Sequence, residues 1–166
     1  MTYHSQIGQD RFVDDVLGQK RGGTFLDVGC NHWQTINNTC FLEKQRDWSG
    51  VAIDVNPTFA VGWQRNRPKT NFYLQDATTS DYGELCGWMP DVIDYLSVDL
   101  EPPSLSWKAL QRVLESRVLF RVITFETDFY RYKESREPSR KLLTSLGYKL
   151  VVPGQQDDFW VNPKLC

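Results

Sequence analysis

The sequence has no long apolar segment, no marked excess of either charge and few of the residues that bind metals. No run of about 18 apolar residues occurs, so no membrane-spanning helix is predicted. The net charge is −2 with both signs interspersed, which argues against a basic nucleic-acid surface or a polyacidic tail. The first residues hold no basic stretch followed by an apolar core, so we expect no secretory signal and a cytoplasmic location.

Cysteine and histidine are also scarce. The chain has four cysteines and two histidines, and no two cysteines form a C-x-x-C pair. Structural zinc sites need four tight ligands at short spacings, so we expect no such site. Cys30, Cys40, Cys86 and Cys166 are expected to be reduced thiols, as in most cytosolic proteins.

The glycine-rich loops that cradle phosphates are absent as well. Dinucleotide-binding folds carry G-x-G-x-x-G after the first strand, and P-loop proteins carry G-x-x-x-x-G-K-[ST]. Here Gly29 stands alone, and Trp33 follows where the backbone would have to approach a pyrophosphate. NAD(P) and P-loop nucleotides are therefore disfavoured, and a nicotinamide-dependent oxidoreductase is kept as a minor alternative.

What the sequence does have is a regular alternation of apolar strands and amphipathic helices. Its 166 residues suit a single domain, 1–166, with an N-terminal helix at about 5–20 and a sheet core from residue 24. Further helices are predicted at 36–46, from 56, at 104–117 and at 138–146. Strands are predicted at 24–29, 50–55, 71–74, 92–100, 121–126, 148–152 and 158–161. Because the last two form a hairpin, we predict an α/β fold with a Rossmann-like, doubly wound, mostly parallel sheet and one antiparallel strand.

Acidic residues stand at the ends of the first three predicted strands. Asp27 precedes Gly29, Asp54 ends the second strand and Asp76 follows the third. Ligands of such sheets bind along the carboxyl edge, where an acid can accept hydrogen bonds from a ribose diol. A cationic sulfonium compound without phosphates, S-adenosylmethionine, suits these acids. We expect Asp27, Gly29, Asn31, Asp54 and Asp76 to bind it, with Asp76 near the adenine edge.

A second acidic group follows the next two strands. Asp99 and Glu101 end the fourth strand, and Glu126 and Asp128 end the fifth. Residues two apart on a strand face the same side, so neighbouring strands would gather these carboxylates at one rim. Crowded carboxylates raise one another's pKa or bind a cation, and either outcome suits removing a proton from an acceptor hydroxyl. We predict Asp99, Glu101 and Glu126 as catalytic residues. A divalent metal on Asp99, Glu126 and Asp128 is a weaker hypothesis.

The same acids also have a purely structural interpretation. An acid at the end of a single strand is a solvated cap more often than a ligand. The second group would then cap helices or pair with Arg112, Arg121 or Arg131. Three acids at the ends of successive strands favour a binding site over this alternative.

Six short motifs follow one another along nearly the whole chain. They are Ser5-Gln6-Ile7-Gly8-Gln9-Asp10, the segment 25–32, the segment 37–43, the segment 48–57, the segment 93–101, and the C-terminal Gly147-Tyr148 with 158–161. In this order they resemble the FkbM family of class I S-adenosylmethionine-dependent methyltransferases.

The resemblance implies O-methylation of a hydroxyl on a sugar, a glycosylated product or another small molecule. It implies a sheet of seven strands with the last antiparallel, and adenosine-binding roles for Asp27, Gly29, Asp54 and Asp76. The loop after Gly29 lacks a second glycine common in such enzymes, so the cofactor's tail would be held by Asn31 or by the Ser5-Gln6 pair. The sequence Glu101-Pro102-Pro103-Ser104 replaces the family's frequent E-G-x-E, which leaves the catalytic role of that loop open.

Other functions remain as alternatives. A methyltransferase acting on nitrogen, protein or RNA is one, and a non-catalytic relic that binds cofactor or a partner is another, because the glycine loop is reduced. We expect a small-molecule or carbohydrate acceptor, no nucleic acid and no membrane. The sequence names neither the acceptor nor the oligomeric state, for which a homodimer is one outcome.

Overall fold

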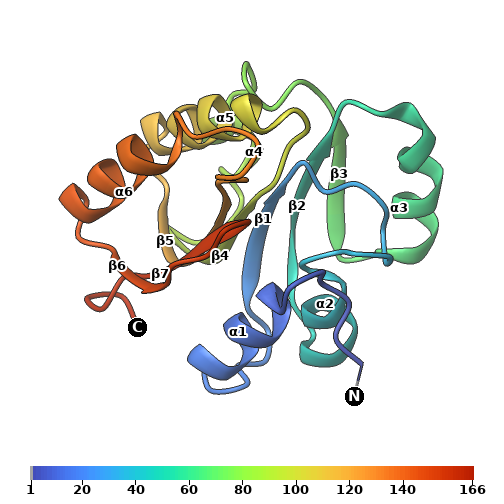
Figure 1. Cartoon of the computed structure of the whole chain (residues 1–166). Helices are drawn as coiled ribbons and strands as arrows, with labels where there is room; N and C mark the ends of the chain where they lie inside the picture. The colour runs from blue at the N-terminus through green and yellow to red at the C-terminus, as the bar shows by residue number, and fades with distance from the viewer. Residues whose placement is uncertain (1) are drawn as a thin grey trace.

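The fold is a seven-stranded sheet with helices on both faces, shown in Figure 1 by a computed structural model that describes residues 2–166. The strands are β1 Thr24–Val28, β2 Ser49–Asp54, β3 Thr70–Leu74, β4 Val92–Val98, β5 Leu119–Glu126, β6 Lys149–Val152 and β7 Asp157–Val161. The helices are α1 Gln9–Val16, α2 Cys40–Arg46, α3 Ala60–Asn66, α4 Tyr82–Leu85, α5 Pro103–Glu115 and α6 Arg136–Ser145, with a 3₁₀ turn η1 at Pro57–Phe59.

The strand order is β3-β2-β1-β4-β5-β7-β6. Strands β1 to β5 pair in parallel, and β7 runs antiparallel to both β5 and β6. The predicted fold class is therefore confirmed. The order reverses between β1 and β4, and the loops after these two strands leave in opposite directions, which opens a crevice at their carboxyl ends. No helix within residues 2–166 is long and apolar enough to cross a lipid bilayer.

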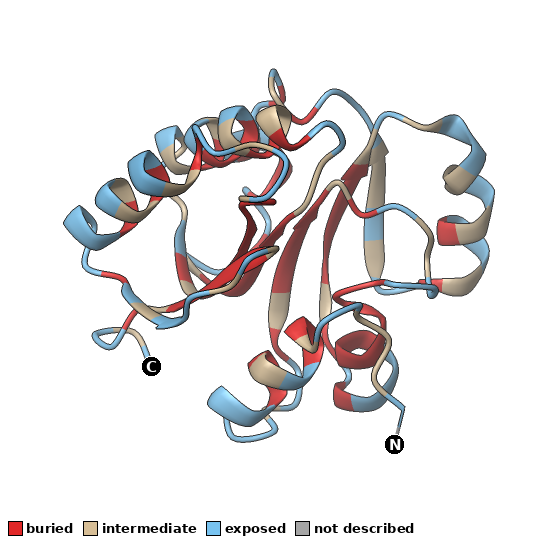
Figure 2. Cartoon of the chain, in the orientation of Figure 1, coloured by how far each residue is buried: buried red, intermediate tan, exposed pale blue. Residues whose placement is uncertain are grey.

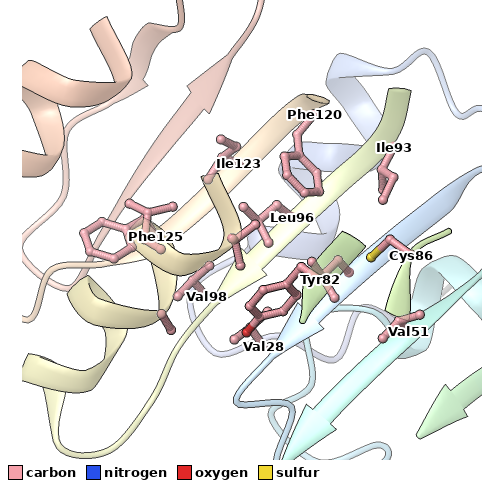
Figure 3. Packing of buried hydrophobic residues seen from close by; sticks show 14 of the residues in the cluster. Val28, Val51, Tyr82, Cys86, Ile93, Leu96, Val98, Phe120, Ile123 and Phe125 are labelled. Carbon is pink, nitrogen blue, oxygen red and sulfur yellow. The ribbon is translucent and has the colours of Figure 1, made fainter. Parts of the chain in front are cut away.

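The alternation of side chains along the strands builds two cores. On β1, Leu26 and Val28 face a large cluster that includes residues of α4, α5 and α6, whereas Phe25 faces a second cluster with residues of α1 and α2. Figure 2 shows the central strands buried along most of their length, and Figure 3 shows Leu96, Ile123 and other residues of the first cluster packed together. Burial on both faces explains the nearly continuous apolar runs in the sequence.

The structure corrects several predicted boundaries. The helix predicted at 5–20 spans only Gln9–Val16, and Ser5 does not cap it, because the Ser5 hydroxyl donates to Asp10 while Gly8 begins the helix in the left-handed conformation. The helix predicted at 36–46 begins only at Cys40. The short helix α4, Tyr82–Leu85, lies where the sequence predicted neither a helix nor a strand.

The packing predicts a large cost for truncating the centre of the sheet. Leu96 is fully buried, so Leu96→Ala should lower the free energy of unfolding by about 2–5 kcal/mol through lost burial and a cavity. Val61 on α3 is 53% exposed, and Val61→Ala should change it by no more than about 0.5 kcal/mol. Urea denaturation monitored by circular dichroism measures both. Equal effects of the two substitutions would contradict this packing.

Candidate active site

A cavity of about 1050 Å³ lies along the carboxyl edge of the sheet, at the crevice between β1 and β4. Loops after β1 to β5 line it, together with the first residue of β7. It gathers every site residue predicted from the sequence: Asp27, Gly29, Asn31, Asp54, Asp76, Asp99, Glu101, Glu126 and Asp128. The cavity slightly exceeds the usual range of about 300–1,000 Å³ for small-molecule sites.

Gly29 lets the backbones of β1 and β4 approach each other at the mouth of this cavity. Its φ is +79°, and a Cβ built on it would lie 1.9 Å from the carbonyl oxygen of Asp99. An L side chain therefore meets both strain and a backbone clash here. The single glycine of the predicted ligand loop is required by the sheet itself, before any ligand is considered.

Asp54 at the end of β2 organises the loop after Gly29. Its Oδ2 accepts the backbone N–H of Asn31 at 2.9 Å, and its Oδ1 accepts the N–H of Asn56 at 2.9 Å. Asn31 adopts a left-handed conformation, with φ at +51°. Each carboxylate oxygen retains a further lone pair for a ligand. Asp54 thus joins the loops after β1 and β2 and still offers two acceptors to the cavity.

Asp76 follows β3 and is exposed on the cavity wall. Its Oδ1 accepts the backbone N–H of Thr78 at 2.8 Å and the Thr78 hydroxyl at 2.7 Å. These hydrogen bonds lower the pKa of Asp76. The carboxylate is therefore held ionised at the β3 side of the cavity.

Asp27 is buried and lies one residue before the end of β1, on the face covered by α1 and α2. Its Oδ2 accepts the Thr39 hydroxyl at 2.8 Å. Burial raises the pKa of Asp27 to about 6, against the lowering effects of the Thr39 hydrogen bond and of the Arg67 charge. Asp27 is a carboxylate in the floor of the cavity and not an exposed residue at its rim.

Asp99 and Glu126 form a close pair on the β4–β5 side of the cavity. Burial, and next the charge of Asp157, raises the pKa of Asp99. Burial, and next the charge of Asp99, raises the pKa of Glu126. The Ser106 hydroxyl accepts the N–H of Leu100 at 2.8 Å and donates to Glu126 Oε2 at 2.8 Å. Ser106 thereby orients one member of the pair.

Arg131 neutralises part of the acidic rim. It binds both oxygens of Glu101, at 2.6 and 3.0 Å, and also contacts Asp128 Oδ2 at 3.0 Å. Oxygens of Glu101, Glu126 and Asp128 lie within 4.8 Å of one another, a set that differs from the predicted metal ligands by including Glu101 in place of Asp99. The pairing alternative thus holds for Arg131, whereas Arg121 pairs with Asp94.

Sequence reasoning missed Asp157. It is the first residue of β7 and the partner of Glu126 in the antiparallel pairing, which brings it to the carboxyl edge of the parallel strands. Burial raises its pKa to about 6, and Gln9 of α1 donates to its Oδ2 at 3.0 Å. The second strand of the hairpin runs antiparallel to β5, so it begins at the edge where the parallel strands end. An acid at the start of that strand was therefore the sequence signal that could have predicted Asp157.

The fold is that of class I methyltransferases. No protein-family model matches the chain, and no curated protein sequence matches it. A TehB-like SAM-dependent methyltransferase from Corynebacterium glutamicum superimposes with a TM-score of 0.61 and 16% identity, over 95% of this chain and 89% of that one. A putative rRNA methylase from Clostridium thermocellum gives 0.62 and 14% identity, over 96% of each chain.

A third structure contains a cofactor product. The 1,6-didemethyltoxoflavin-N1-methyltransferase of Burkholderia thailandensis, with bound S-adenosylhomocysteine, superimposes with a TM-score of 0.56 and 14% identity, over 93% of this chain and 75% of that one. At these identities the similarity establishes the fold alone. The resemblance to the FkbM family stays a prediction.

The raised pKa of Glu126 predicts a pH-dependent stability. Folding favours the neutral carboxyl, so the free energy of unfolding falls as pH rises from the ordinary carboxyl pKa of about 4.3 toward the raised value. Glu126→Gln cannot ionise and keeps an acceptor for Ser106. We expect it to stabilise the ligand-free protein at pH 8 by on the order of 2 kcal/mol, and by much less at pH 5.

Urea denaturation at the two pH values measures this difference. Glu115 on α5 is the matched control, because its side chain is 65% exposed and Glu115→Gln should have little effect at either pH. An equal gain from Glu126→Gln at pH 5 and pH 8 would show that charge burial is not its cause.

Proposed function

We propose that this protein is an S-adenosylmethionine-dependent methyltransferase that methylates a hydroxyl of a small-molecule or carbohydrate acceptor. The observation that carries the proposal is the cavity at the strand-order reversal, lined by acids from five successive parallel strands. Its size supports joint occupancy by a cofactor and an acceptor. The fold similarity supports the same class of enzyme.

The residues present suit the cofactor. Carboxylates favour a ligand that carries a positive sulfonium and a positive amino group, and Asp27 in the cavity floor supplies such a charge. Asp54 offers two acceptor oxygens for a ribose diol, and Asp76 lies on the β3 side, where an adenine edge would be met. Gly29 keeps the cavity mouth free of a side chain. For the cofactor's tail we propose Asn31 and Gln6, because Ser5 is engaged by Asp10.

The Asp99–Glu126 pair is suited to proton removal. Burial and the neighbouring acids raise the pKa of both carboxyls, and a carboxylate of raised pKa is a better base near neutral pH than an ordinary carboxylate. The bound cofactor supplies the electrophilic methyl group. Asp99 accepts the proton of the acceptor hydroxyl, and Glu126, held by Ser106, orients Asp99. Glu101 is occupied by Arg131, so we assign it to the rim of the acceptor site.

The surroundings of the pair favour an uncharged or cationic acceptor. Asp157 and Asp128 stand beside it, and Arg131 is already engaged by two carboxylates. A polyanion such as RNA would meet repulsion at this rim. The exposed ring of Tyr130 at the cavity offers a surface on which a sugar could stack. Transfer to an amine is the alternative outcome of an acceptor screen.

Cofactor binding gives the first test. S-adenosylhomocysteine at 100 times its dissociation constant should stabilise the protein by about 2.7 kcal/mol, and NADH should not. Asp54→Ala should remove this thermal shift, because both ribose acceptors and two loop hydrogen bonds are lost. Asp91→Ala, at an exposed position before β4, should retain it. Absence of any shift with the unaltered protein would contradict the proposed function.

Turnover gives the second test. An acceptor screen by mass spectrometry identifies substrates by the gain of one methyl group. With such a substrate, Asp99→Asn should lower kcat by about 10²- to 10⁴-fold because the base is lost. S-adenosylhomocysteine should still bind to this variant. Undiminished kcat in both Asp99→Asn and Glu126→Gln would assign proton removal elsewhere.

A further inference from the structure

The segment Asn37-Asn38-Thr39 belongs to one of the six sequence motifs, the segment 37–43, and the proposed function assigns it no role. All three side chains are buried, and each bonds a different part of the cavity wall. The Asn37 amide donates to the carbonyl of Cys30 at 3.0 Å, and the Asn38 amide donates to the Ser97 hydroxyl at 2.9 Å. The Thr39 hydroxyl contacts Asp27 at 2.8 Å. The segment therefore joins β1, its following loop and β4 from behind the cavity.

Arg67, between α3 and β3, stands behind this segment. Its side chain is fully buried, and its guanidinium lies over the ring of Trp63, with 4.5 Å between the guanidinium carbon and the ring centroid. Nε donates to Glu43 Oε2 at 2.7 Å, and Nη2 donates to the Thr39 hydroxyl at 3.0 Å. Nη1 donates to the carbonyl of Trp33 at 3.0 Å and to Asn37 Oδ1 at 3.1 Å. Because four acceptors hold the planar guanidinium, its position is closely defined.

The direction of the Thr39 hydrogen bond follows from these contacts. A hydroxyl has one hydrogen, and Thr39 accepts from Arg67, so its own hydrogen goes to an acceptor. Asp27 Oδ2 is closer than Asn37 Oδ1, at 2.8 against 3.2 Å. Glu43, Arg67, Thr39 and Asp27 thus form one continuous chain of hydrogen bonds from α2 to the cavity.

Few other groups act on the Asp27 carboxyl. Ser97 on β4 hydrogen-bonds to it, and Asp99 at the end of the same strand repels its charge. Cys30 and Tyr95 are neutral neighbours, because burial raises the pKa of each well above its ordinary value. Among the groups that act on Asp27, Arg67 is the cation. Its charge lowers the pKa of Asp27, and its Nη2 also donates to the Thr39 hydroxyl that contacts Asp27.

We propose that Thr39 and Arg67 are positioning residues that keep the buried Asp27 carboxylate ionised and directed into the cavity, where it holds the positive end of the cofactor. The proposal rests on the proposed function for the identity of that ligand. The effect of Arg67 and Thr39 on Asp27, a relay from Arg67, does not depend on that ligand, and it can be measured in the ligand-free protein. The pKa of Asp27, which burial has raised to about 6, should rise further when the Thr39 hydroxyl is removed.

Carboxyl ¹³C NMR of the ligand-free protein tests the relay directly. The Asp27 signal is assigned with Asp27→Asn. Thr39→Val keeps the shape of the side chain but removes the hydroxyl, and should move the Asp27 titration midpoint from about pH 6 to about pH 7. Thr39→Ser keeps the hydroxyl and should leave the midpoint near that of the unaltered protein. Equal midpoints in the valine and serine variants would overturn the proposal.

A second variant changes Arg67 instead of Thr39. Arg67→Lys keeps a positive charge but cannot hold Glu43 and Thr39 together with a planar fork. It too should raise the Asp27 midpoint, and it decides the question if the valine variant does not fold. An unchanged midpoint in a folded Arg67→Lys variant would also overturn the proposal.

The dissociation constant of S-adenosylhomocysteine, measured by calorimetry from pH 5.5 to 8.5, tests the consequence for binding. In the unaltered protein affinity should fall as pH drops through about 6, because Asp27 becomes neutral. In Thr39→Val the fall should begin about one pH unit higher, with roughly fivefold weaker binding at pH 6 and a smaller difference at pH 8.5. Thr39→Ser should follow the unaltered protein. A loss of affinity that is uniform across pH would indicate a merely structural role and refute the relay.

The two proposals fail in distinguishable ways. If the unaltered protein does not bind S-adenosylhomocysteine while the Asp27 midpoint still responds to Thr39→Val, the proposed function is wrong and the relay stands. If binding occurs but its pH profile is the same in the valine and serine variants, the proposed function stands and the relay is wrong.

Discussion

The contact between the backbones of β1 and β4 at Gly29 is the constraint on which the binding site depends. These strands are neighbours where the strand order reverses, so their following loops diverge and leave a crevice. The carbonyl of Asp99 occupies the space that a side chain at position 29 would need. One glycine thereby keeps the two strands in register up to their ends and delivers the acids after β1 and β4 to the same cavity.

The acids gathered there are unfavourable for folding, which argues that they serve binding or chemistry. Glu126 and Asp157 are buried and Asp99 is half-buried, and within residues 2–166 none of the three forms an ion pair. Burial without a cation raises their pKa values. Elsewhere most of the buried acids form ion pairs, as Asp14 does with Arg46 and Asp158 with Arg140. Unfavourable buried acids confined to one cavity are typical of functional sites.

The sequence predicted the sheet well because each strand is buried on both faces and carries a continuous apolar run between breakers. It predicted helix starts less well, because capping side chains have several partners available. Asn37, for example, lies within the helix predicted at 36–46, but its side chain holds the Cys30 carbonyl and the Arg67 guanidinium, and the helix begins at Cys40. The acids at strand ends were predicted because parallel strands share one edge. Asp157 was not predicted because its place depends on an antiparallel pairing. Arg67 was not predicted because it lies behind the site and reaches it through buried contacts with Thr39 and Asn37.

The carboxyl groups at the two ends of the cavity have different neighbours, and this difference suits the different roles that the proposed function gives them. Asp27 and Asp54 are supported by donors: the Thr39 hydroxyl backed by Arg67 for the first, and two backbone N–H groups for the second. Donors favour the charged form, which a positive ligand requires. Asp99 and Glu126 instead face other acids, so the pair retains a proton more tightly than an ordinary carboxyl does. The proposed reaction would need a negative charge beside the cationic donor and a group that accepts a proton beside the acceptor, and the two properties can coexist because different strands carry them.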